Sequence, residues 1–527
     1  MKITLKPSDS LFNAGLIGFY NILKFNKENV QLTENELIFD SSSLENFSDK
    51  YFTYISYRYE KLLSVNKLIG YRETLNEDIS IQDLKKIMID FKKITSKSYM
   101  GIFQLFEEKE IIDLYSSLKI IDKKSTKEDI KFQVDILNKI INRLEDKNIY
   151  KHLCVVNSAY TVINKTYENV AFFNSSNKDK NFINVYDKFF TQNTINYLSL
   201  NNNNYTFECT TCGNPINDLS YEYSFITGLG YPSERKSNFG YNFNNEKAMC
   251  PMCRLIYTCI CAGATLKYDD GFFINFNSNL KTMLELNNKL FDFVLKSNST
   301  IHSFYEFIMD NIQNYNFEYT QLLKYNNNSV KPHIQTILLN KEYIDILTKH
   351  NKEIKDIGND SFEFAGEKIY IFTKLNELLY NNDSINNFIN LILYYKLSEK
   401  SFIKESTLDT LIKINYIKSE GETMEDKTEI KQARIEGYKL RDKYIELGLK
   451  DKIKQNSHTL YHGINSKQKF DILNIILKMY LYANMELPNI IAKIQDIQND
   501  TYKILLQSFL VGFMSTPYKK NKEESEE

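Results

Sequence analysis

The sequence predicts an α+β protein that is predominantly helical and multi-lobed, with a cysteine module in mid-chain and a helical bundle at the C-terminal end. The 527 residues include only 17 glycines and 7 prolines, well below the usual ~7% and ~5%, so long uninterrupted elements are expected. Apolar residues recur at helical spacing over most of the chain. At ~150 residues per domain, the length allows three or four domains.

The N-terminal elements can be placed in order. Lys2 to Leu5 is strand-like, and Ser8 to Ser10 offers capping residues for an apolar helix that follows. A second strand-like segment runs from Val30 to Asp40, and a long helix is predicted from Leu44 to about Val65. Further helices fill the chain to about residue 150, and polar breaks at 174–180 and 201–204 precede a separate module.

These patterns predict five segments. They are a mostly helical N-terminal α+β domain (1–200), a cysteine module with a glycine-containing loop (201–280), a mainly helical middle region (281–400), a C-terminal helical bundle (401–518) and a disordered charged tail (519–527). In the bundle, one predicted helix places Phe470, Leu473, Ile476, Leu477 and Tyr480 on one face.

Composition and motifs exclude several classes of protein. The 66 basic and 67 acidic residues give a net charge of −1, so any nucleic-acid contact must come from local patches. The N-terminus lacks the apolar core of a signal peptide, and no apolar run approaches ~18 residues, so we expect a cytoplasmic protein with no membrane contact. No P-loop occurs, which argues against a P-loop ATPase, and no catalytic constellation is found.

Two Cys-x-x-Cys pairs carry the clearest chemical signal. Cys209 and Cys212 form the first pair, and Cys250 and Cys253 the second. Four thiolates on two tight turns are the ligand set of a tetrahedral, structural Zn²⁺ site, since a catalytic zinc keeps one position open. The sequence therefore predicts one structural zinc ion. The alternatives are a redox-active Cys-x-x-Cys, which needs only one pair in a βαβ setting, and four unrelated buried thiols.

The remaining cysteines fit a structural role. Cys259 and Cys261 lie one residue apart in an apolar run, and Cys154 lies in another. Buried cysteine packs as a small apolar side chain, so all three are predicted to be core thiols. Asp269 to Gly271 is interpreted as a hairpin turn between two strands rather than as a carboxylate pair.

The segment between the cysteine pairs contains candidate nucleic-acid contacts. Gly228, Gly230 and Gly240 accompany Arg235, Lys236 and Asn238 among several aromatic residues, and Lys247 follows. Cations can contact phosphates, amides can contact base edges and aromatic rings can stack on bases. Composition by itself favours the simpler interpretation, a solvated loop attached to the metal site.

Several segments resemble the CXXC–CXXC family of CRISPR-associated proteins. They are the paired cysteines, the run from Cys250 to Ile256, Ala262 to Ala264, and Phe273 to Asn277. Asn13 to Phe19 looks like the opening of that family, and the segments 470–482 and 508–513 look like its closing helices. Cys259 and Cys261 depart from the plainer apolar residues expected there.

The resemblance implies a non-catalytic large subunit of a type I-B, Cascade-type interference complex in antiviral defence. Such a subunit binds guide RNA and target DNA, recognises a short motif beside the target and recruits a helicase-nuclease, with other Cascade subunits as partners. Base pairing then reads the target while the protein reads the motif. Under this interpretation Arg235, Lys236, Asn238 and Lys247 become candidate RNA or DNA contacts.

Two other function classes stay open, a stand-alone zinc-module scaffold for protein interactions and a metalloenzyme with a site assembled from distant residues. The C-terminal bundle raises a further question, since in this group it is similar to a separate small subunit. Glu420 to Thr423 would be encoded by a purine stretch resembling a ribosome-binding site upstream of Met424. An internal start at Met424 would then yield the bundle as a separate chain. The alternative is an ordinary acidic linker.

Overall fold

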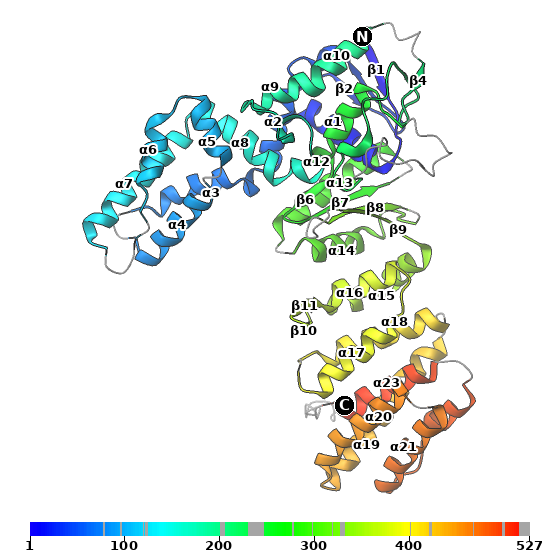
Figure 1. Cartoon of the computed structure of the whole chain (residues 1–527). Coiled ribbons are helices and arrows are strands. Elements are labelled where there is room, and N and C mark those ends of the chain that lie inside the picture. Colours follow the sequence, from blue (N-terminus) through cyan, green and yellow to red (C-terminus); the bar gives the residue numbers. More distant parts are fainter. Residues whose placement is uncertain are drawn as a thin grey trace, which may run out of the picture. The chain divides into compact units, whose positions relative to one another are not determined.

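The computed structural model confirms an α+β fold that is predominantly helical, with small sheets and a mid-chain cysteine cluster (Figure 1). The structure describes residues 1–76, 79–94, 97–119, 121, 125–200, 206–229, 247–276, 279–297, 299–318, 320–326, 333–400, 402–420, 424–466, 468–497 and 501–515. The chain divides into two compact units. Unit 1 holds residues 1–304 and 319–338, and unit 2 holds residues 305–318 and 339–527. The predicted domain boundaries are not tested by this division and stay predictions.

Unit 1 begins with a small sheet against its first helix. Strand β1 (Lys2–Leu5) pairs with β3 (Leu37–Asp40), which also pairs with β2 (Val30–Leu32), all antiparallel. The predicted strand from Val30 to Asp40 is therefore a hairpin, closed at its turn by a hydrogen bond from Thr33 Oγ1 to the Glu36 carbonyl (3.0 Å). Helix α1 (Ser10–Phe25) is capped by Asp9, whose carboxylate accepts from the Leu11 and Phe12 amides.

The prediction of one helix from Leu44 to Val65 is wrong, because the chain breaks at Tyr59. Helix α2 (Phe47–Arg58) ends there, and α3 (Ser64–Gly70) begins after a short 3₁₀ turn. The Tyr59 side chain is fully buried, and its hydroxyl donates toward the carbonyls of Cys261 (2.9 Å) and Ala264 (3.0 Å). A tertiary contact thus ends a helix whose apolar periodicity continues.

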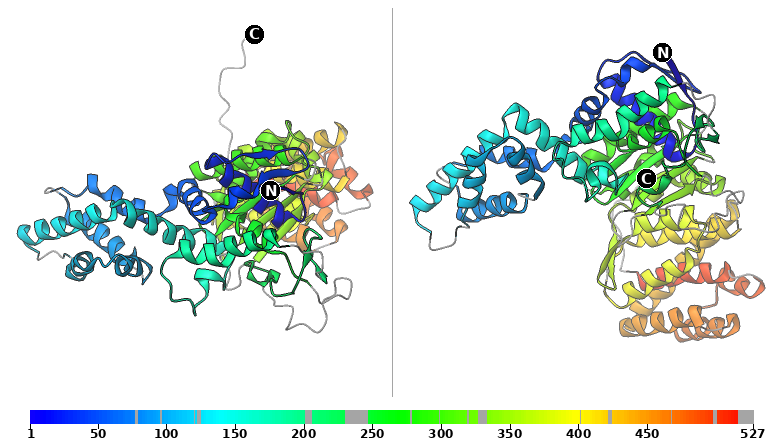
Figure 2. Two further views of the ribbon diagram at one scale, coloured as in Figure 1. Left: turned by 90° about the horizontal axis from the view of Figure 1, so that it is seen from above. Right: turned by 45° about the horizontal axis from the view of Figure 1, so that its top comes forward.

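The next helices of unit 1 lie together as a lobe beside the part that contains the sheets (Figures 1 and 2). These helices are α4 (Ile81–Ile94), α5 (Lys97–Leu105), α6 (Lys109–Ser117), α7 (Lys127–Leu144) and α8 (Lys147–Thr161). Two shorter helices, α9 (Phe182–Tyr186) and α10 (Gln192–Ser199), flank a π-helical turn, η6 (Asp187–Thr191), and lead to the cysteine module.

The second half of unit 1 contains the module and a four-stranded antiparallel sheet. The cysteine hairpin is formed by β4 (Phe207–Glu208) and β5 (Pro215–Ile216). The helices that follow are α11 (Pro251–Thr258), α12 (Ile260–Gly263), α13 (Leu280–Lys296) and α14 (Thr300–Asn311). The division between the units falls within α14. The sheet order is β6 (Thr265–Lys267), β7 (Asp270–Asn275), β8 (Gln321–Asn326) and β9 (His333–Leu338). The predicted hairpin around Asp269 is confirmed, with Lys267 paired to Asp270.

In its described residues, unit 2 is helical apart from one hairpin, and its helices pack in successive rows (Figure 2). The hairpin is β10 (Ser361–Phe364) with β11 (Glu367–Tyr370). The helices are α15 (Lys341–Asp356), α16 (Ile371–Tyr380), α17 (Asn386–Leu397), α18 (Glu405–Glu420), α19 (Met424–Glu446), α20 (Lys450–Ser466), α21 (Lys469–Tyr482), α22 (Asn489–Ala492) and α23 (Thr501–Met514). No described helix is both long and apolar enough to cross a membrane.

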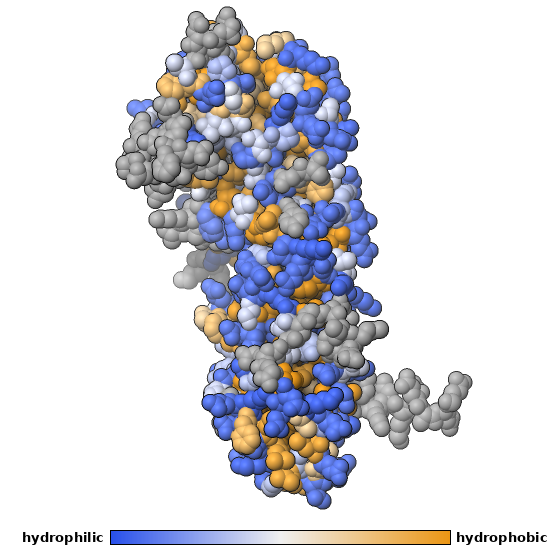
Figure 3. Space-filling view, turned by 90° about the vertical axis from the view of Figure 1, so that its right-hand side faces the viewer, coloured by the Kyte–Doolittle hydropathy of each residue, from blue (hydrophilic) through white to orange (hydrophobic). Residues whose placement is uncertain are grey.

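The apolar side chains of helix α21 are buried on one face and exposed on the other. Ile476 and Tyr480 are buried, whereas Phe470 (69% exposed), Leu477 (40%) and Leu481 (68%) face outward. Phe470 and Leu477, which the sequence places on one face with Ile476 and Tyr480, are therefore not covered by neighbouring helices as those two residues are. Apolar side chains are visible on the surface at this end of the bundle (Figure 3). Both faces of α21 are apolar, so hydrophobic periodicity alone could not say which face the neighbouring helices cover.

Glycine allows backbone-to-backbone packing at the central helix crossing of unit 1. A β-carbon at Gly18 of α1 would lie 2.0 Å from the Cys259 carbonyl oxygen, and one at Gly263 of α12 would lie 2.0 Å from that of Ala14. Gly15 makes the same approach to Ile256 of α11, at 2.2 Å. Side chains at these positions would separate the helices. Gly15 and Gly18 lie in the apolar helix that the sequence predicts after Ser8 to Ser10.

Glycines also allow close backbone packing between α19 and α23 in unit 2. A β-carbon at Gly437 would lie 2.2 Å from the Phe509 carbonyl oxygen, and one at Gly512 would lie 2.1 Å from that of Arg434. The hydroxyl of Ser508 also donates to the Ile430 carbonyl across this crossing (2.9 Å). Five glycines of this glycine-poor chain thus allow the close helix crossings of the two units.

We expect Gly18→Ala to lower the free energy of unfolding of unit 1 by about 1–3 kcal/mol or more, because overpacked cores must shift to admit the methyl group. Urea unfolding followed by circular dichroism measures the change. Gly70→Ala is the matched control, since Gly70 is helical with no atom within 4 Å of its β-carbon position. That substitution should leave stability unchanged or raise it by about 0.5–1 kcal/mol. Equal effects of the two substitutions would contradict the close-packing account.

Candidate metal centre

The four predicted ligands come from two different local structures. Cys209 and Cys212 lie on the turn of the β4–β5 hairpin, and Cys250 is the N-cap of α11, with Cys253 in the first turn. Pro251 occupies the first helical position, where its missing amide hydrogen costs nothing. The N-terminus of a helix favours negative charge, so α11 contributes one favourable interaction to the thiolate form that a metal ion requires of both cysteines.

Backbone hydrogen bonds shape the hairpin turn. The Cys209 amide donates to the Asn214 carbonyl (2.8 Å), and the Gly213 amide donates to the Cys209 carbonyl (2.8 Å). Gly213 has φ of 73°, a left-handed conformation that suits glycine. On the other side, the Cys253 amide donates to Cys250 Sγ (3.4 Å). These bonds aim all four sulfur atoms at one point.

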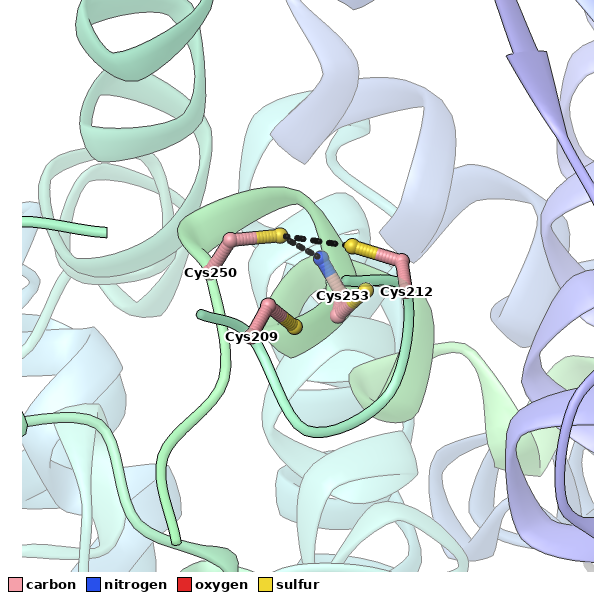
Figure 4. A group of neighbouring side chains, drawn as sticks. All are labelled: Cys209, Cys212, Cys250 and Cys253. Carbon is pink, nitrogen blue, oxygen red and sulfur yellow. Dashed lines mark hydrogen bonds between the residues drawn. The ribbon is translucent and has the colours of Figure 1, made fainter. Parts of the chain in front are cut away.

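The sulfur atoms are placed for tetrahedral coordination (Figure 4). All four Sγ atoms lie within 4.8 Å of one another, and Cys212 Sγ is 3.7 Å from Cys250 Sγ. A tetrahedral thiolate site with metal–sulfur distances of ~2.3 Å has sulfur–sulfur edges of ~3.8 Å. Each cysteine is a free thiol rather than half of a disulfide. Cys209, Cys250 and Cys253 are buried and Cys212 is exposed, so the cluster can hold a metal ion at the edge of the core.

Hydrogen bonding among the four sulfurs splits their pKa values. Bonds from neighbouring thiols lower the pKa of Cys209. Bonds donated toward Cys209 and Cys212 raise the pKa of Cys250 and of Cys253. A metal ion needs all four groups as thiolates, so binding would displace protons from the two helix cysteines.

One comparison with known proteins matches this segment. Residues 202–265 match the sequence model of the CRISPR-associated CXXC–CXXC family. This match supports membership of the CRISPR-associated CXXC–CXXC family. The match covers the cysteine hairpin, the segment that follows it, α11, α12 and the start of β6. No curated protein and no solved structure matches the chain.

Side-chain hydrogen bonds connect the N-terminal segment of the chain to the cysteine module. Ser8 Oγ donates to the carbonyl of Thr211, which lies between the first two cysteines (3.2 Å). Tyr257 of α11 donates to Asp9 (2.5 Å), the residue that caps α1. Burial and the Asp9 carboxylate raise the pKa of the Tyr257 hydroxyl well above its usual range, so it stays a donor. Sequence patterns gave no signal for these partners beyond the capping residues themselves.

A second connection runs through buried asparagines. Asn13 of α1 donates from Nδ2 to Asn275 Oδ1 of β7 (3.0 Å), and Asn275 donates to Gln321 of β8 (3.0 Å). Asn287 of α13 accepts from the Ile274 amide and donates to the Ile274 carbonyl. Asn13 and Asn275 belong to separate segments of the predicted family resemblance, and the structure brings them into direct contact.

The guanidinium of Arg254, which follows Cys253, is surrounded by aromatic rings rather than paired with a described carboxylate. Its guanidinium lies over the rings of Tyr221 (4.3 Å), Phe190 (5.1 Å) and Phe225 (5.5 Å). Among the described residues no carboxylate pairs with it, and burial lowers its pKa. Cation–π contacts of this kind are worth most when desolvated. They hold the η6 turn and the 221–225 segment against α11.

The other sequence-predicted residues have different outcomes. Cys259 and Cys261 are fully buried away from the cluster, and burial raises the pKa of the Cys261 thiol to about 12. Cys154 is also buried, with its pKa raised to about 11 for the same reason. All three are core thiols, as predicted.

Of the predicted nucleic-acid contacts, Lys247 alone falls within the described residues. It is half-buried and precedes Ala248, whose carbonyl accepts from the Thr210 amide in the first cysteine turn (2.9 Å). Arg235, Lys236 and Asn238 lie outside the described residues. The nucleic-acid role of all four residues stays a prediction.

We expect the purified chain to hold one metal ion, which tetrathiolate ligand chemistry predicts to be zinc, and each of Cys209→Ser, Cys212→Ser, Cys250→Ser and Cys253→Ser to abolish stoichiometric binding. Elemental analysis by mass spectrometry, with thermal unfolding in parallel, measures both metal content and module stability. Cys259→Ala and Cys261→Ala are the controls and should keep one metal ion per chain. Metal loss in these two controls, or metal retained in all four ligand variants, would contradict the assignment.

Proposed function

We propose that this CRISPR-associated protein is the non-catalytic large subunit of a type I-B, Cascade-type interference complex in antiviral defence. In this role it binds guide RNA and target DNA, recognises the motif beside the target and recruits a separate helicase-nuclease. Other Cascade subunits are its partners, and the cytoplasm is its site of action. The single observation that carries the proposal is the four-thiolate cluster inside the segment that matches the family.

The ligand geometry supports a structural rather than a catalytic metal ion. Four protein sulfurs already supply a tetrahedral shell, so no position is left for substrate or water, and zinc is the metal that this ligand set favours. The cluster lies where the N-terminus, the hairpin and α11 meet. A metal ion at this point therefore stabilises the module and the start of the intervening loop.

Charge distribution is consistent with a subunit that contacts nucleic acid locally. The chain has a net charge of −1, so binding must depend on placed cations rather than on a uniformly basic surface. The proposed contacts are Lys247, next to the cysteine turn, and Arg235, Lys236 and Asn238, which lie between the two cysteine pairs in the sequence. Few side chains are needed, because base pairing reads the target and the protein reads only a short motif.

A stand-alone scaffold and a metalloenzyme are the alternative functions. A scaffold predicts protein partners without bound RNA, whereas a metalloenzyme predicts an exchangeable metal ion that supports turnover. Metal that is lost only on replacement of a cysteine ligand, together with unfolding of the module, favours the structural role. Co-purification then separates the effector subunit from the scaffold.

We expect the affinity-tagged chain, co-expressed with the genes that neighbour its own, to elute with partner subunits and with RNA that carries CRISPR repeat sequence. Sequencing of the bound RNA and mass spectrometry of the eluted proteins check this result. Cys250→Ser should lower the recovery of both, because the module unfolds without its metal ion, whereas Cys154→Ala should not. Recovery of protein partners with no RNA would overturn the proposal in favour of the scaffold.

The C-terminal bundle supports a second product of the same gene. Helix α19 begins at Met424, and α19 packs on α20, α22 and α23, so a chain that started at Met424 would contain this whole group of helices. We propose that internal initiation at Met424 produces it as a separate small subunit. Since α18 also packs on α23, the shorter chain would expose a surface that α18 covers in the full chain.

We expect Met424→Leu to eliminate a short product that begins at residue 424 and to leave the full-length chain in place. Intact-mass measurement of the purified complex detects both products. Met485→Leu is the control for a methionine in the same bundle without the upstream purine stretch. Absence of the short product from the unmodified complex would show that residues 420–423 are only a linker.

A further inference from the structure

A cleft separate from the cysteine cluster lies between α2 and α13 in unit 1. Its volume is about 480 Å³, within the range of small-ligand pockets. The charged and polar groups that line it include Arg58, Lys61, Asn288, Asp292 and Lys296, and Tyr57 lines it as well. None of these residues is used by the metal centre.

Arg58 is a buried cation for which the described residues supply no counter-ion. The residue is 8% exposed, and its guanidinium lies 3.6 Å from the centre of the Phe291 ring. It donates to Tyr54 Oη (3.1 Å) and, at a long 3.5 Å, to the Ala264 carbonyl. Within the described part of the chain it forms no ion pair, and its Nε has no hydrogen-bond partner. A buried charge in this state is unfavourable unless a partner completes it.

Lys267, a buried cation on β6, provides a contrast within the same unit. Its Nζ donates to three carbonyls at the C-terminal end of α13, those of Val294 (3.0 Å), Leu295 (3.3 Å) and Ser297 (2.5 Å). All three of its hydrogens are used inside the fold, and the helix end favours positive charge. The fold therefore can satisfy a buried cation here, and at Arg58 it leaves the charge facing a cleft.

The other charges of the cleft indicate the charge of its ligand. Lys61 and Lys296 add two cations to Arg58, while Glu60 and Asp292 contribute two carboxylates. The lining therefore carries a net charge of about +1 when all five groups are ionised at neutral pH. That value suits a phosphodiester, which carries one negative charge, better than a terminal phosphate, which carries nearly two.

The cleft also presents a flat ring and groups for a base edge. Tyr57 is 62% exposed, and its ring is braced by Phe25, with ring centres 4.7 Å apart. Asn288 accepts a hydrogen bond from Asn21 on Oδ1, which leaves its amide nitrogen as a donor, and Asp292 is an acceptor. Exposed tyrosine rings stack on unpaired bases of any sequence.

We propose that this cleft binds one nucleotide of a single-stranded nucleic acid, with the phosphodiester at Arg58 between Lys61 and Lys296 and the base stacked on Tyr57. The proposal rests on the function proposed above and names one of its binding sites. Guide RNA and a displaced DNA strand both offer this chemistry. RNA and DNA probes of matched sequence distinguish the two sources.

The test uses the full chain and the fluorescence anisotropy of labelled oligouridylate and oligothymidylate. Tyr57→Ala should weaken binding of the preferred probe about tenfold, the typical contribution of one stacked base. Lys296→Gln should lower the slope of log affinity against log salt by about 0.7, the value for one phosphate contact on a single strand. Arg58→Met should weaken binding at least as much as Tyr57→Ala, with thermal unfolding used to check that it folds.

Two substitutions in unit 1 are matched controls. Phe132→Ala removes an equally exposed ring on α7, and Lys289→Gln removes a lysine on α13 that pairs with Glu285. Neither residue lines the cleft, so neither variant should change affinity. Binding by the Tyr57→Ala and Lys296→Gln variants that equals the unmodified chain, or no binding of either probe by the unmodified chain, overturns the proposal. Recovery of RNA with the complex tests the proposed function separately, since it can succeed while the cleft variants bind normally.

Discussion

The approach of α1 to α11 and α12 is the interaction on which the rest of unit 1 depends. Gly15, Gly18 and Gly263 let two helix backbones meet at distances that any side chain would prevent. Because the helices are so close, Ser8 and Asp9 reach the cysteine turn and Tyr257, and Asn13 reaches β7. The N-terminal residues and the metal module are therefore parts of one core, although about 200 residues separate them in the sequence.

The metal cluster and the glycine crossing support each other. Cys250 and Cys253 lie on the helix that Gly15 contacts, so a metal ion fixes the start of α11 and α11 in turn fixes α1. The free energy of metal binding at a tetrathiolate site stabilises the folded state, because the metal ion orders segments that would otherwise lack a shared core. The hairpin between β4 and β5 is such a segment, since each strand has two residues. A metal ion bound by these four cysteines would thus contribute to the folding of unit 1.

Three of the buried cations in unit 1 have different kinds of partner. Lys267 is satisfied by the carbonyls at the end of α13, and Arg254 by a surrounding of aromatic rings. Arg58 has one tyrosine hydroxyl, a distant carbonyl and a ring face, and it borders a cleft. A chain with almost no net charge can bind a polyanion through such placed groups, because the field near a desolvated cation is strong at short range.

The sequence by itself determined the features that depend on neighbouring residues. Cys-x-x-Cys spacing and the glycine and proline beside it define two turns, so the ligand set was predictable, as were β1, the β6–β7 hairpin and most helices. Features that depend on distant residues were decided by the tertiary structure. The break at Tyr59 follows from its hydrogen bonds to α12. The exposed face of α21 is set by the helices that cover its other face. The pairing of β7 with β8 depends on the return of the chain to the sheet after two helices. Local periodicity shows which residues are apolar. It does not show what packs against an apolar face, a buried charge or a close-packed glycine, because those contacts form only when separate segments of the chain meet.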